Sequence, residues 1–319
     1  MANARFDDSD VTGATGYLMS NMAHLEAEAF KQEFPEYKYS RFVPLDRSAP
    51  QYAEQIGVRV LAYRGGLSRY SSQGTDIPTA DVSQNVQFVP VHTFATGYRF
   101  TVMELNQAKF YGRPLDQDRA DAVVATAEAD TNRIMLLGGL EENGSFIATG
   151  EGLYTSPSVP TTRATATIES IIAAGGTDMA QKVLNFFVSL RSAVYKDQTN
   201  TVHKPNTFLL PTSVMMLLQG TLLSASNGSN WTLLEFLKHN FADCTFDDDI
   251  NLETAGADGT RRVLCYKRDI RVVKGHVPMP LTFQSMEGPH NMGFFVPAVM
   301  RTAGVEWRIP KAAHYIDAV

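Results

Sequence analysis

The chain has 319 residues, of which 44% are hydrophobic and 19% are charged, and its formal net charge is -6. This composition is typical of a globular protein with a sizeable core, and it excludes collagen-like and disordered chains. The acidic balance, without a basic tail, argues against a protein that binds nucleic acid tightly through phosphates. The chain has no apolar run long enough to cross a membrane, and its polar start lacks a signal-peptide pattern, so we expect a cytoplasmic product.

Residues 1–55 predict an N-terminal arm around one short helix. Apolar residues recur at close to helical spacing between Leu18 and Phe34, and Pro35 ends the pattern. No compact core is visible in this stretch, so we expect the arm to pack on something else.

A long β-hairpin is predicted next. Residues 58–64 and 86–103 have strand-like patterns, and about twenty residues rich in Gly, Ser, Gln and Asp lie between them. A structureless loop of that length is improbable inside a compact domain, which favours a projecting two-stranded arm. Because an isolated hairpin is marginal in water, we expect this arm to rest on a partner.

The clearest helix of the chain follows the break at Gly112–Pro114. Asp116 is a candidate N-cap, Asp118 falls in the first turn, and Gly138–Gly139 ends the helix. It should be about 33 Å long at 1.5 Å per residue. One apolar stripe is expected to face the body of the subunit and comprises Ala120, Val123, Val124, Ala127, Thr131 and Ile134.

Helices and strands alternate from about residue 140 to residue 288. Capping boxes are predicted at Asp178 with Gln181 and at Thr232 with Glu235. The first opens a helix whose apolar stripe is Met179, Val183, Phe186, Phe187, Leu190 and Val194. Further expected elements are strands at 207–210, 262–267 and 270–273, a helix at 213–219, and a terminal β pair of 294–299 with 304–309.

The motifs of common enzymes and metal sites are missing from the sequence. There is no G-x-S-x-G, Walker loop, dinucleotide-binding loop, CxxC or H-E-x-x-H, so no catalytic, cofactor-binding or metal-binding residue is predicted. The acidic run Asp247–Asp249 fails the calcium-loop pattern because Leu252 stands where glycine is needed, which favours a solvated acidic loop. Cys244 and Cys265 are expected to be buried free thiols.

The order of these elements, together with local motifs, resembles the major capsid proteins of tailed bacteriophages. The motifs are Leu25–Glu28 with Phe30, Pro35–Tyr39, Thr75–Pro78 with Ala80–Val82, Glu104–Leu105 with Ala108, Gly152–Tyr154, Leu209–Pro211, Thr232–Leu237, and Phe295–Pro297 with Arg301, Thr302 and Gly304. The resemblance runs from about residue 18 to the end and implies an α+β, HK97-like capsid fold. Its expected parts are an N-terminal arm (1–55), an E-loop hairpin (56–92), a peripheral domain with a spine helix (93–140 and 289–319) and an α/β axial domain (141–288).

The resemblance implies a structural protein that self-assembles into hexamers and pentamers and forms an icosahedral head around double-stranded DNA, without sequence-specific binding. Expected partners are a scaffolding protein, a portal protein and a decoration or cement protein, with assembly in the host cytoplasm. Two alternatives stay open from the sequence: an encapsulin-type shell around protein cargo, and a soluble α/β enzyme, which would need a concave pocket with convergent polar groups.

The resemblance also suggests where two subunits meet, because the E-loop of this fold lies across a neighbouring subunit. The arm carries Arg59, Arg64 and Arg69, and no acidic residue occurs between Val58 and Gly74. The acidic residues predicted to oppose them on the spine helix, off its apolar stripe, are Asp118, Asp121, Glu128 and Asp130. We therefore expect inter-subunit contacts between this basic arm and this acidic helix.

Overall fold

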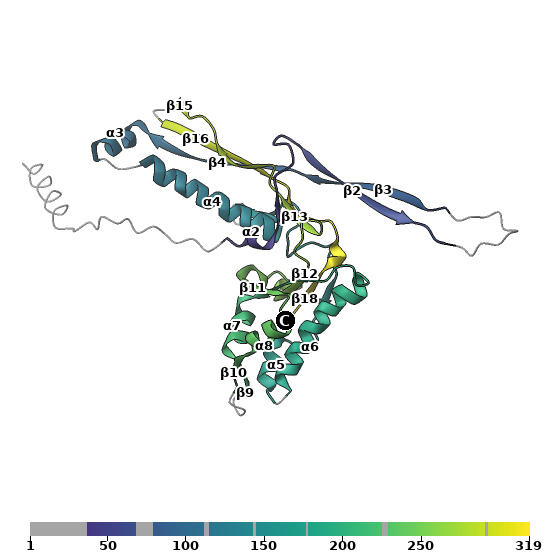
Figure 1. The fold of residues 1–319 in the computed structure, drawn as a ribbon. Coiled ribbons are helices and arrows are strands. Elements are labelled where there is room, and N and C mark those ends of the chain that lie inside the picture. Colours follow the sequence, from purple (N-terminus) through teal and green to yellow (C-terminus); the bar gives the residue numbers. More distant parts are fainter. Residues whose placement is uncertain are drawn as a thin grey trace, which may run out of the picture. The chain divides into compact units, whose positions relative to one another are not determined.

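A computed structural model describes residues 37–67, 79–111, 115–142, 145–176, 178–224, 229–290 and 293–319 (Figure 1). Residues 37–319 form one unit, and the helix predicted between Leu18 and Phe34 lies outside the described residues. The helices are α2 (Tyr39–Phe42), α3 (Val102–Tyr111), α4 (Leu115–Leu137), α5 (Ile168–Ala174), α6 (Met179–Ser192), α7 (Thr212–Gly220) and α8 (Leu233–Asn240), with short helical turns η1 (Ala193–Gln198, π-helical), η2 (Ile250–Glu253), η3 (Ala257–Gly259) and η4 (Pro310–Ala312).

The described strands belong to several separate sheets, so the α+β class predicted from the sequence is confirmed. The strands are β1 (Leu45–Asp46), β2 (Gln55–Arg64), β3 (Asp81–Pro90), β4 (His92–Thr101), β5 (Gly139–Glu142), β6 (Ser145–Ala148), β7 (Thr161–Arg163), β8 (Thr207–Pro211), β9 (Leu222–Ser224), β10 (Ser229–Thr232), β11 (Thr245–Asp249), β12 (Arg262–Tyr266), β13 (Val273–His276), β14 (Met279–Phe283), β15 (Glu287–His290), β16 (Gly293–Thr302), β17 (Gly304–Trp307) and β18 (Ala313–Asp317).

Strands β2 and β3 form the predicted hairpin arm. They pair antiparallel over their whole length, from Gln55 opposite Pro90 to Arg64 opposite Asp81 (Figure 1). The strand expected at 86–103 is two strands, because the chain leaves β3 at Val91 and continues as β4 in another sheet. The middle of the connection between β2 and β3, residues 68–78, lies outside the described residues.

The long helix α4 packs on a sheet formed by β4, β14, β15 and β16. The bounds of α4 match the prediction. Ala127 and Ile134 of this helix pack with Met300 of β16 in a small core. The predicted apolar stripe is wrong at Val124, whose side chain is 41% exposed, whereas Val123 is only 7% exposed. Adjacent helix residues point about 100° apart, so only one of the two valines can face the core.

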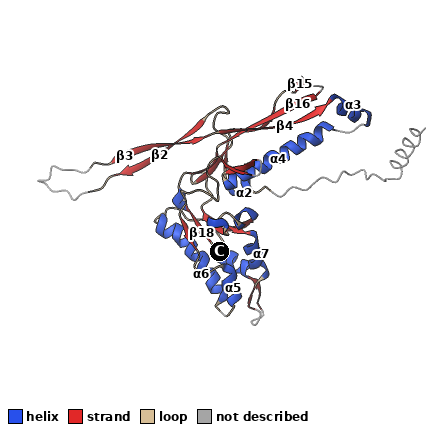
Figure 2. Ribbon diagram, turned by 180° about the vertical axis from the view of Figure 1, so that it is seen from behind, coloured by secondary structure: helices blue, strands red, loops and turns tan. Residues whose placement is uncertain are grey.

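The sheet β11-β8-β12-β18-β7 carries the largest part of the core. Phe187 of α6 contacts Phe208 of β8 and Phe246 of β11, with ring centroids 5.5 Å and 5.7 Å apart. Helices α5, α6 and α7 gather around this sheet (Figure 2).

The apolar stripe predicted for α6 is confirmed, with Phe186 only partly buried. The capping box of Thr232 with Glu235 is confirmed as well, whereas the Asp178 side chain makes no cap hydrogen bond.

The terminal β pair predicted from the sequence is wrong. Strand β16 pairs with β4, β14 and β15, whereas β17 pairs antiparallel with β13. Gly304, the first residue of β17, has φ +70°, which suits glycine and lets the chain pass from one sheet to the other. The strand expected at 270–273 begins at Val273, because Val272 N donates to Asp269 O in a turn.

Strand β18 lies in the same sheet as β8 and β12, between β12 and β7. Strands β16 and β18, which were both expected in the same domain, lie in different sheets: β16 is in the sheet that packs on α4, and β18 is in the five-stranded sheet. The domain boundaries expected from the resemblance stay a proposal.

Candidate assembly surfaces

One face of the β2–β3 hairpin is apolar and exposed. In an antiparallel pair, residues directly opposite each other point to the same side, and so do their second neighbours along each strand. The register therefore places five exposed apolar side chains on one side, which we call the apolar ribbon face: Leu61, Tyr63, Val82, Val86 and Phe88. Tyr63 is 81% exposed and Phe88 is 64% exposed.

The two described arginines of the hairpin are exposed on opposite faces. Arg59 lies opposite Val86 on the apolar ribbon face, and Arg64 lies opposite Asp81 on the other face. Arg69 lies outside the described residues. Two arginines of α4 form ion pairs outside the hairpin, Arg119 with Glu104 and Arg133 with Glu141.

The acidic residues of α4 are in different environments. Glu128 accepts a hydrogen bond from the Tyr39 hydroxyl at 2.9 Å, and burial together with this carboxylate raises the pKa of Tyr39 to about 12. Asp130 is partly buried, and burial raises the pKa of its carboxyl. Asp121 is exposed, and the side chain of Asp118 lies outside the described residues. The structure therefore brings Glu128 into a contact within its own chain.

A groove with a volume of about 240 Å³ runs beside α4, and its lining is mostly apolar. Val124 lines it, which explains the exposure of this valine. The opposite walls come from the segment around β1 and from β14 and β16, with Tyr39, Leu45, Met279, Leu281, Phe283 and Met300 among the lining residues.

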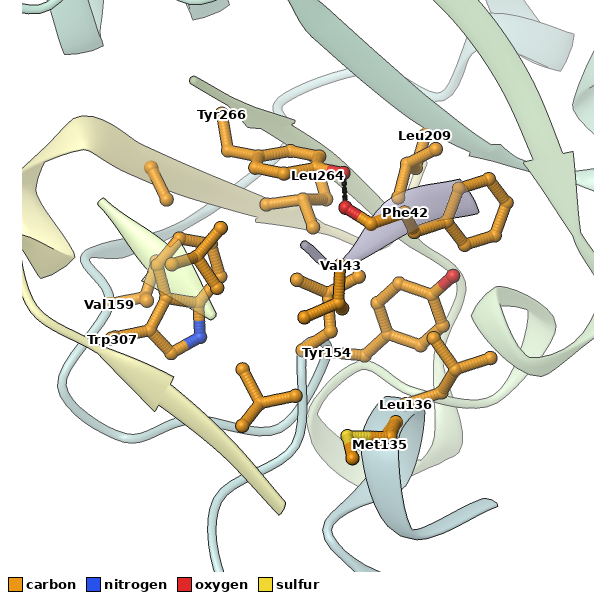
Figure 3. Close-up of a cluster of buried hydrophobic side chains, with 14 of the residues drawn as sticks. Phe42, Val43, Met135, Leu136, Tyr154, Val159, Leu209, Leu264, Tyr266 and Trp307 are labelled. Atoms are coloured by element: carbon orange, nitrogen blue, oxygen red, sulfur yellow. Dashed lines mark hydrogen bonds between the residues drawn. The ribbon is translucent and has the colours of Figure 1, made fainter. Parts of the chain in front are cut away.

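The short helix α2 joins α4 to the five-stranded sheet, a role that the sequence did not predict. Phe42 and Val43 are buried among Met135, Leu136, Tyr154, Tyr266 and Trp307, as Figure 3 shows. The Tyr266 hydroxyl donates to the carbonyl oxygen of Phe42 at 2.7 Å. On the α4 side, the Tyr39 backbone N–H donates to Asn132 Oδ1 at 3.2 Å.

The acidic run Asp247–Asp249 is not the solvated loop that the sequence favoured. It forms part of β11, which pairs in parallel with β8. Arg41 Nε lies 2.7 Å from Asp247 Oδ2, and Lys38 Nζ lies 3.2 Å from Asp248 Oδ1, so two of the carboxylates hold the α2 segment. The third, Asp249, is buried and accepts from the Tyr154 hydroxyl at 3.3 Å.

A second set of charges is buried where β1 meets β13. Lys274 donates a hydrogen bond to Asp46 and forms an ion pair with it. This hydrogen bond holds the pKa of the Asp46 carboxyl well below its usual range. His276 Nε2 lies 2.6 Å from Glu306 Oε2 on the neighbouring β17. These contacts tie the segment around residue 46 to the sheet.

Among the described residues, no group of three or more His, Cys, Asp and Glu side chains could hold a metal ion. No helix in the described part of the chain is long and apolar enough to cross a membrane. Cys244 and Cys265 are both free thiols, the first partly buried and the second fully buried.

Comparisons with known proteins agree with this architecture. A family model described as major capsid protein matches residues 68–319. No curated protein matches the chain. The fold is similar to that of the capsid of Myoviridae phage XM1, at 20% identity and TM-score 0.79, with 94% of this chain and 98% of that chain covered.

Two further solved structures share the fold. The capsid of an empty GTA particle is 11% identical with TM-score 0.62, covering 98% of this chain and 99% of that one. A virus-like particle from Pyrococcus furiosus is 11% identical with TM-score 0.51, covering 87% and 91%. The chain therefore belongs to the major capsid protein family: it is a structural protein of a virion shell with the HK97-like fold, and not an enzyme.

Proposed function

We propose that this capsid subunit assembles into hexamers and pentamers that close into an icosahedral head around packaged double-stranded DNA. The observation that carries the proposal is the apolar ribbon face of the β2–β3 hairpin. A two-stranded ribbon is marginal in water by itself, and exposed apolar surface of this kind is characteristic of an interaction site. A neighbouring subunit would cover this face in the shell.

Charge complementarity supports the same contact. Arg59 is exposed on the apolar ribbon face of the arm, and Asp121 and Glu128 are exposed on α4. Arg64 is exposed on the opposite face of the arm, where it would contact another part of the neighbouring subunit. We propose that the arm of one subunit lies along α4 of its neighbour, with its apolar side chains toward the groove that Val124 lines. One exposed ion pair contributes only about 0.2–1 kcal/mol, so apolar contacts supply most of the affinity and the charges help to set the register.

The remaining partners follow from the same proposal. A scaffolding protein would direct assembly, a portal protein would occupy one vertex, and a decoration or cement protein is a further candidate; assembly would take place in the host cytoplasm. An encapsulin-type shell around protein cargo is the second candidate, because the same fold also builds a virus-like particle from Pyrococcus furiosus.

The test is negative-stain microscopy of the expressed chain, with and without a co-expressed scaffolding protein, followed by measurement of nuclease-resistant nucleic acid in the particles. We expect closed shells with scaffolding, and DNA inside particles isolated from infected cells. Closed shells that contain one host protein and no nucleic acid would favour the encapsulin alternative. A chain that remains a small oligomer under all conditions would contradict both.

A further inference from the structure

Four segments that are distant in sequence meet at one end of the five-stranded sheet. They are η1, the turn at residues 199–206, the turn at residues 267–271, and η4. Lys267 N donates to Ala312 O at 3.1 Å, and Arg268 N donates to Asn206 Oδ1 at 2.7 Å. With its amide oriented to satisfy its neighbours, the Gln198 side chain donates to the carbonyl oxygen of Lys311 at 2.9 Å.

These segments concentrate positive charge in a chain whose net charge is -6. Residues 196–206, 267–271 and 308–311 contain seven Lys or Arg residues and only two acidic residues, Asp197 and Asp269. We define the basic patch by six of the seven: Lys196, Lys204, Lys267, Arg268, Arg271 and Lys311. The seventh, Arg308, is half-buried, and its Nε lies 3.6 Å from Glu306 Oε1.

The patch is accessible. Lys196, Lys204, Arg268, Arg271 and Lys311 are all exposed, and Lys267 is half-buried. The Arg271 side chain is 80% exposed although its Nη2 lies 3.1 Å from Asp269 Oδ2. The Lys204 ammonium lies 2.7 Å from Asp243 Oδ2, an acidic residue that also pairs with Arg191.

Internal ion pairs do not cancel the positive charge. The hydrogen bond from Arg271 lowers the pKa of Asp269 to about 2, so this carboxylate is ionised and offsets one cation. Asp243 is shared between two cations. Within the described part of the chain, Lys196, Lys267, Arg268 and Lys311 form no ion pair. Burial lowers the pKa of His203, and the nearby positive charge of Lys267 acts in the same direction.

The distribution of these cations suits an extended polyanion. They belong to four segments rather than to one loop, so they present several separate charges instead of a single cradle for one phosphate. Such an arrangement suits nonspecific binding to DNA, because each Lys or Arg neutralises one phosphate and releases a counterion without reading a base.

We infer that the basic patch contacts the phosphate backbone of packaged double-stranded DNA, so that this end of the five-stranded sheet faces the interior of the shell. The inference rests on the proposed function, since it requires a shell that holds DNA. It is compatible with the acidic net charge, because the contact is local, nonspecific and weakened by salt.

The test measures binding of the full-length, unassembled chain to a short random-sequence DNA duplex by fluorescence anisotropy across a range of salt concentrations. The patch variant is Lys196→Glu with Lys311→Glu. The control is Lys182→Glu with Lys238→Glu, which makes the same change in net charge at two exposed positions of α6 and α8. Lys182 lies about 20 Å from Lys196 along the helix at about 1.5 Å per residue.

We expect the patch variant to lose at least about tenfold in affinity for the duplex at low salt. The slope of log affinity against log salt should also decrease in magnitude by about two, because each phosphate contact contributes about 0.9 to this slope. The control should change both quantities much less. Equal losses in the two variants would overturn the inference, since net charge alone would then explain binding. Tight binding of the patch to poly-glutamate but not to the duplex would overturn it as well, in favour of an acidic protein segment.

Microscopy of the same variants separates this inference from the proposed function. If the wild-type chain forms closed shells that hold DNA while the patch variant binds the duplex as the wild type does, the inference fails and the proposed function stands. If no shells form under any condition, the proposed function fails, and the duplex measurement still reports whether the patch binds DNA.

Discussion

Arg262 and Asp317 face each other across β12 and β18 and form a buried, two-pronged ion pair. Arg262 Nε lies 2.6 Å from Asp317 Oδ1, and Nη2 lies 2.8 Å from Oδ2. The guanidinium also lies over the Tyr315 ring, 4.5 Å from its centroid. The pair joins the last strand of the chain to the centre of the sheet, and the two side chains are only 10% and 7% exposed.

Arg262→Met should destabilise the unassembled subunit by about 3–5 kcal/mol, because it leaves the Asp317 carboxylate buried without its partner. The measurement is urea unfolding followed by tryptophan fluorescence. The double variant Arg262→Met with Asp317→Leu is the control and should recover most of the loss, since it removes both charges. A single variant within about 1 kcal/mol of wild type would show that water reaches Asp317.

Val123→Asp and Val124→Asp should have different effects although the residues are adjacent. Val123 is 7% exposed, so an aspartate there should cost about 3 kcal/mol or more in the free energy of unfolding. Val124 is 41% exposed, so the same change should cost about 1 kcal/mol or less. Thermal unfolding of both purified variants checks this, and equal destabilisation would contradict the orientation of α4.

Asp46→Asn should weaken the subunit most near neutral pH. Its hydrogen bond from Lys274 lowers the pKa of Asp46 in the folded state, so the pair stabilises the fold above the unfolded value of about 3.9 and this contribution is lost as the pH falls. At pH 7 we expect a loss of about 3 kcal/mol, because the buried ammonium is left unpaired.

The difference in unfolding free energy between wild type and Asp46→Asn should shrink as the pH falls from about 5 to about 2. Urea unfolding of both proteins at several pH values in this range provides the measurement. A difference that stays constant across the range would mean that the Asp46 carboxylate does not contribute through its charge.

Cys244 should react slowly with a thiol reagent in the folded protein. Burial raises the pKa of its thiol to about 11, so at pH 8 roughly a thousandth of it is the reactive thiolate. The rate should rise about tenfold per pH unit up to pH 10. The fully buried Cys265 should react only on unfolding, and mass spectrometry of the labelled peptides distinguishes the two.

Arg59→Glu with Arg64→Glu should weaken assembly while leaving the subunit folded, because both side chains are exposed. High salt should weaken wild-type assembly in the same direction. Light scattering during assembly is the measurement, and Lys182→Glu with Lys238→Glu is the charge-matched control. Normal assembly of the arm variant at low salt would mean that apolar and backbone contacts alone hold the arm.

The sequence by itself determined the elements whose signals are local. The long helix α4 was predicted with nearly its observed bounds, because Gly112–Pro114 breaks the chain before it and Gly138–Gly139 ends it. The hairpin β2–β3 and the capping box of Thr232 were predicted for the same reason, since each depends on residues close together in the chain. The order of these elements also carried the resemblance to capsid proteins.

Only the tertiary structure decided which strands pair and which charges are satisfied. Strands β16 and β17 are separated by one residue, yet each pairs in a different sheet, because pairing depends on partners far away in the chain. The same holds for the acidic run in β11: Lys38 reaches Asp248 across 210 positions of sequence. Periodicity likewise could not choose between Val123 and Val124, because burial depends on where the facing sheet lies, and no local pattern contains that information.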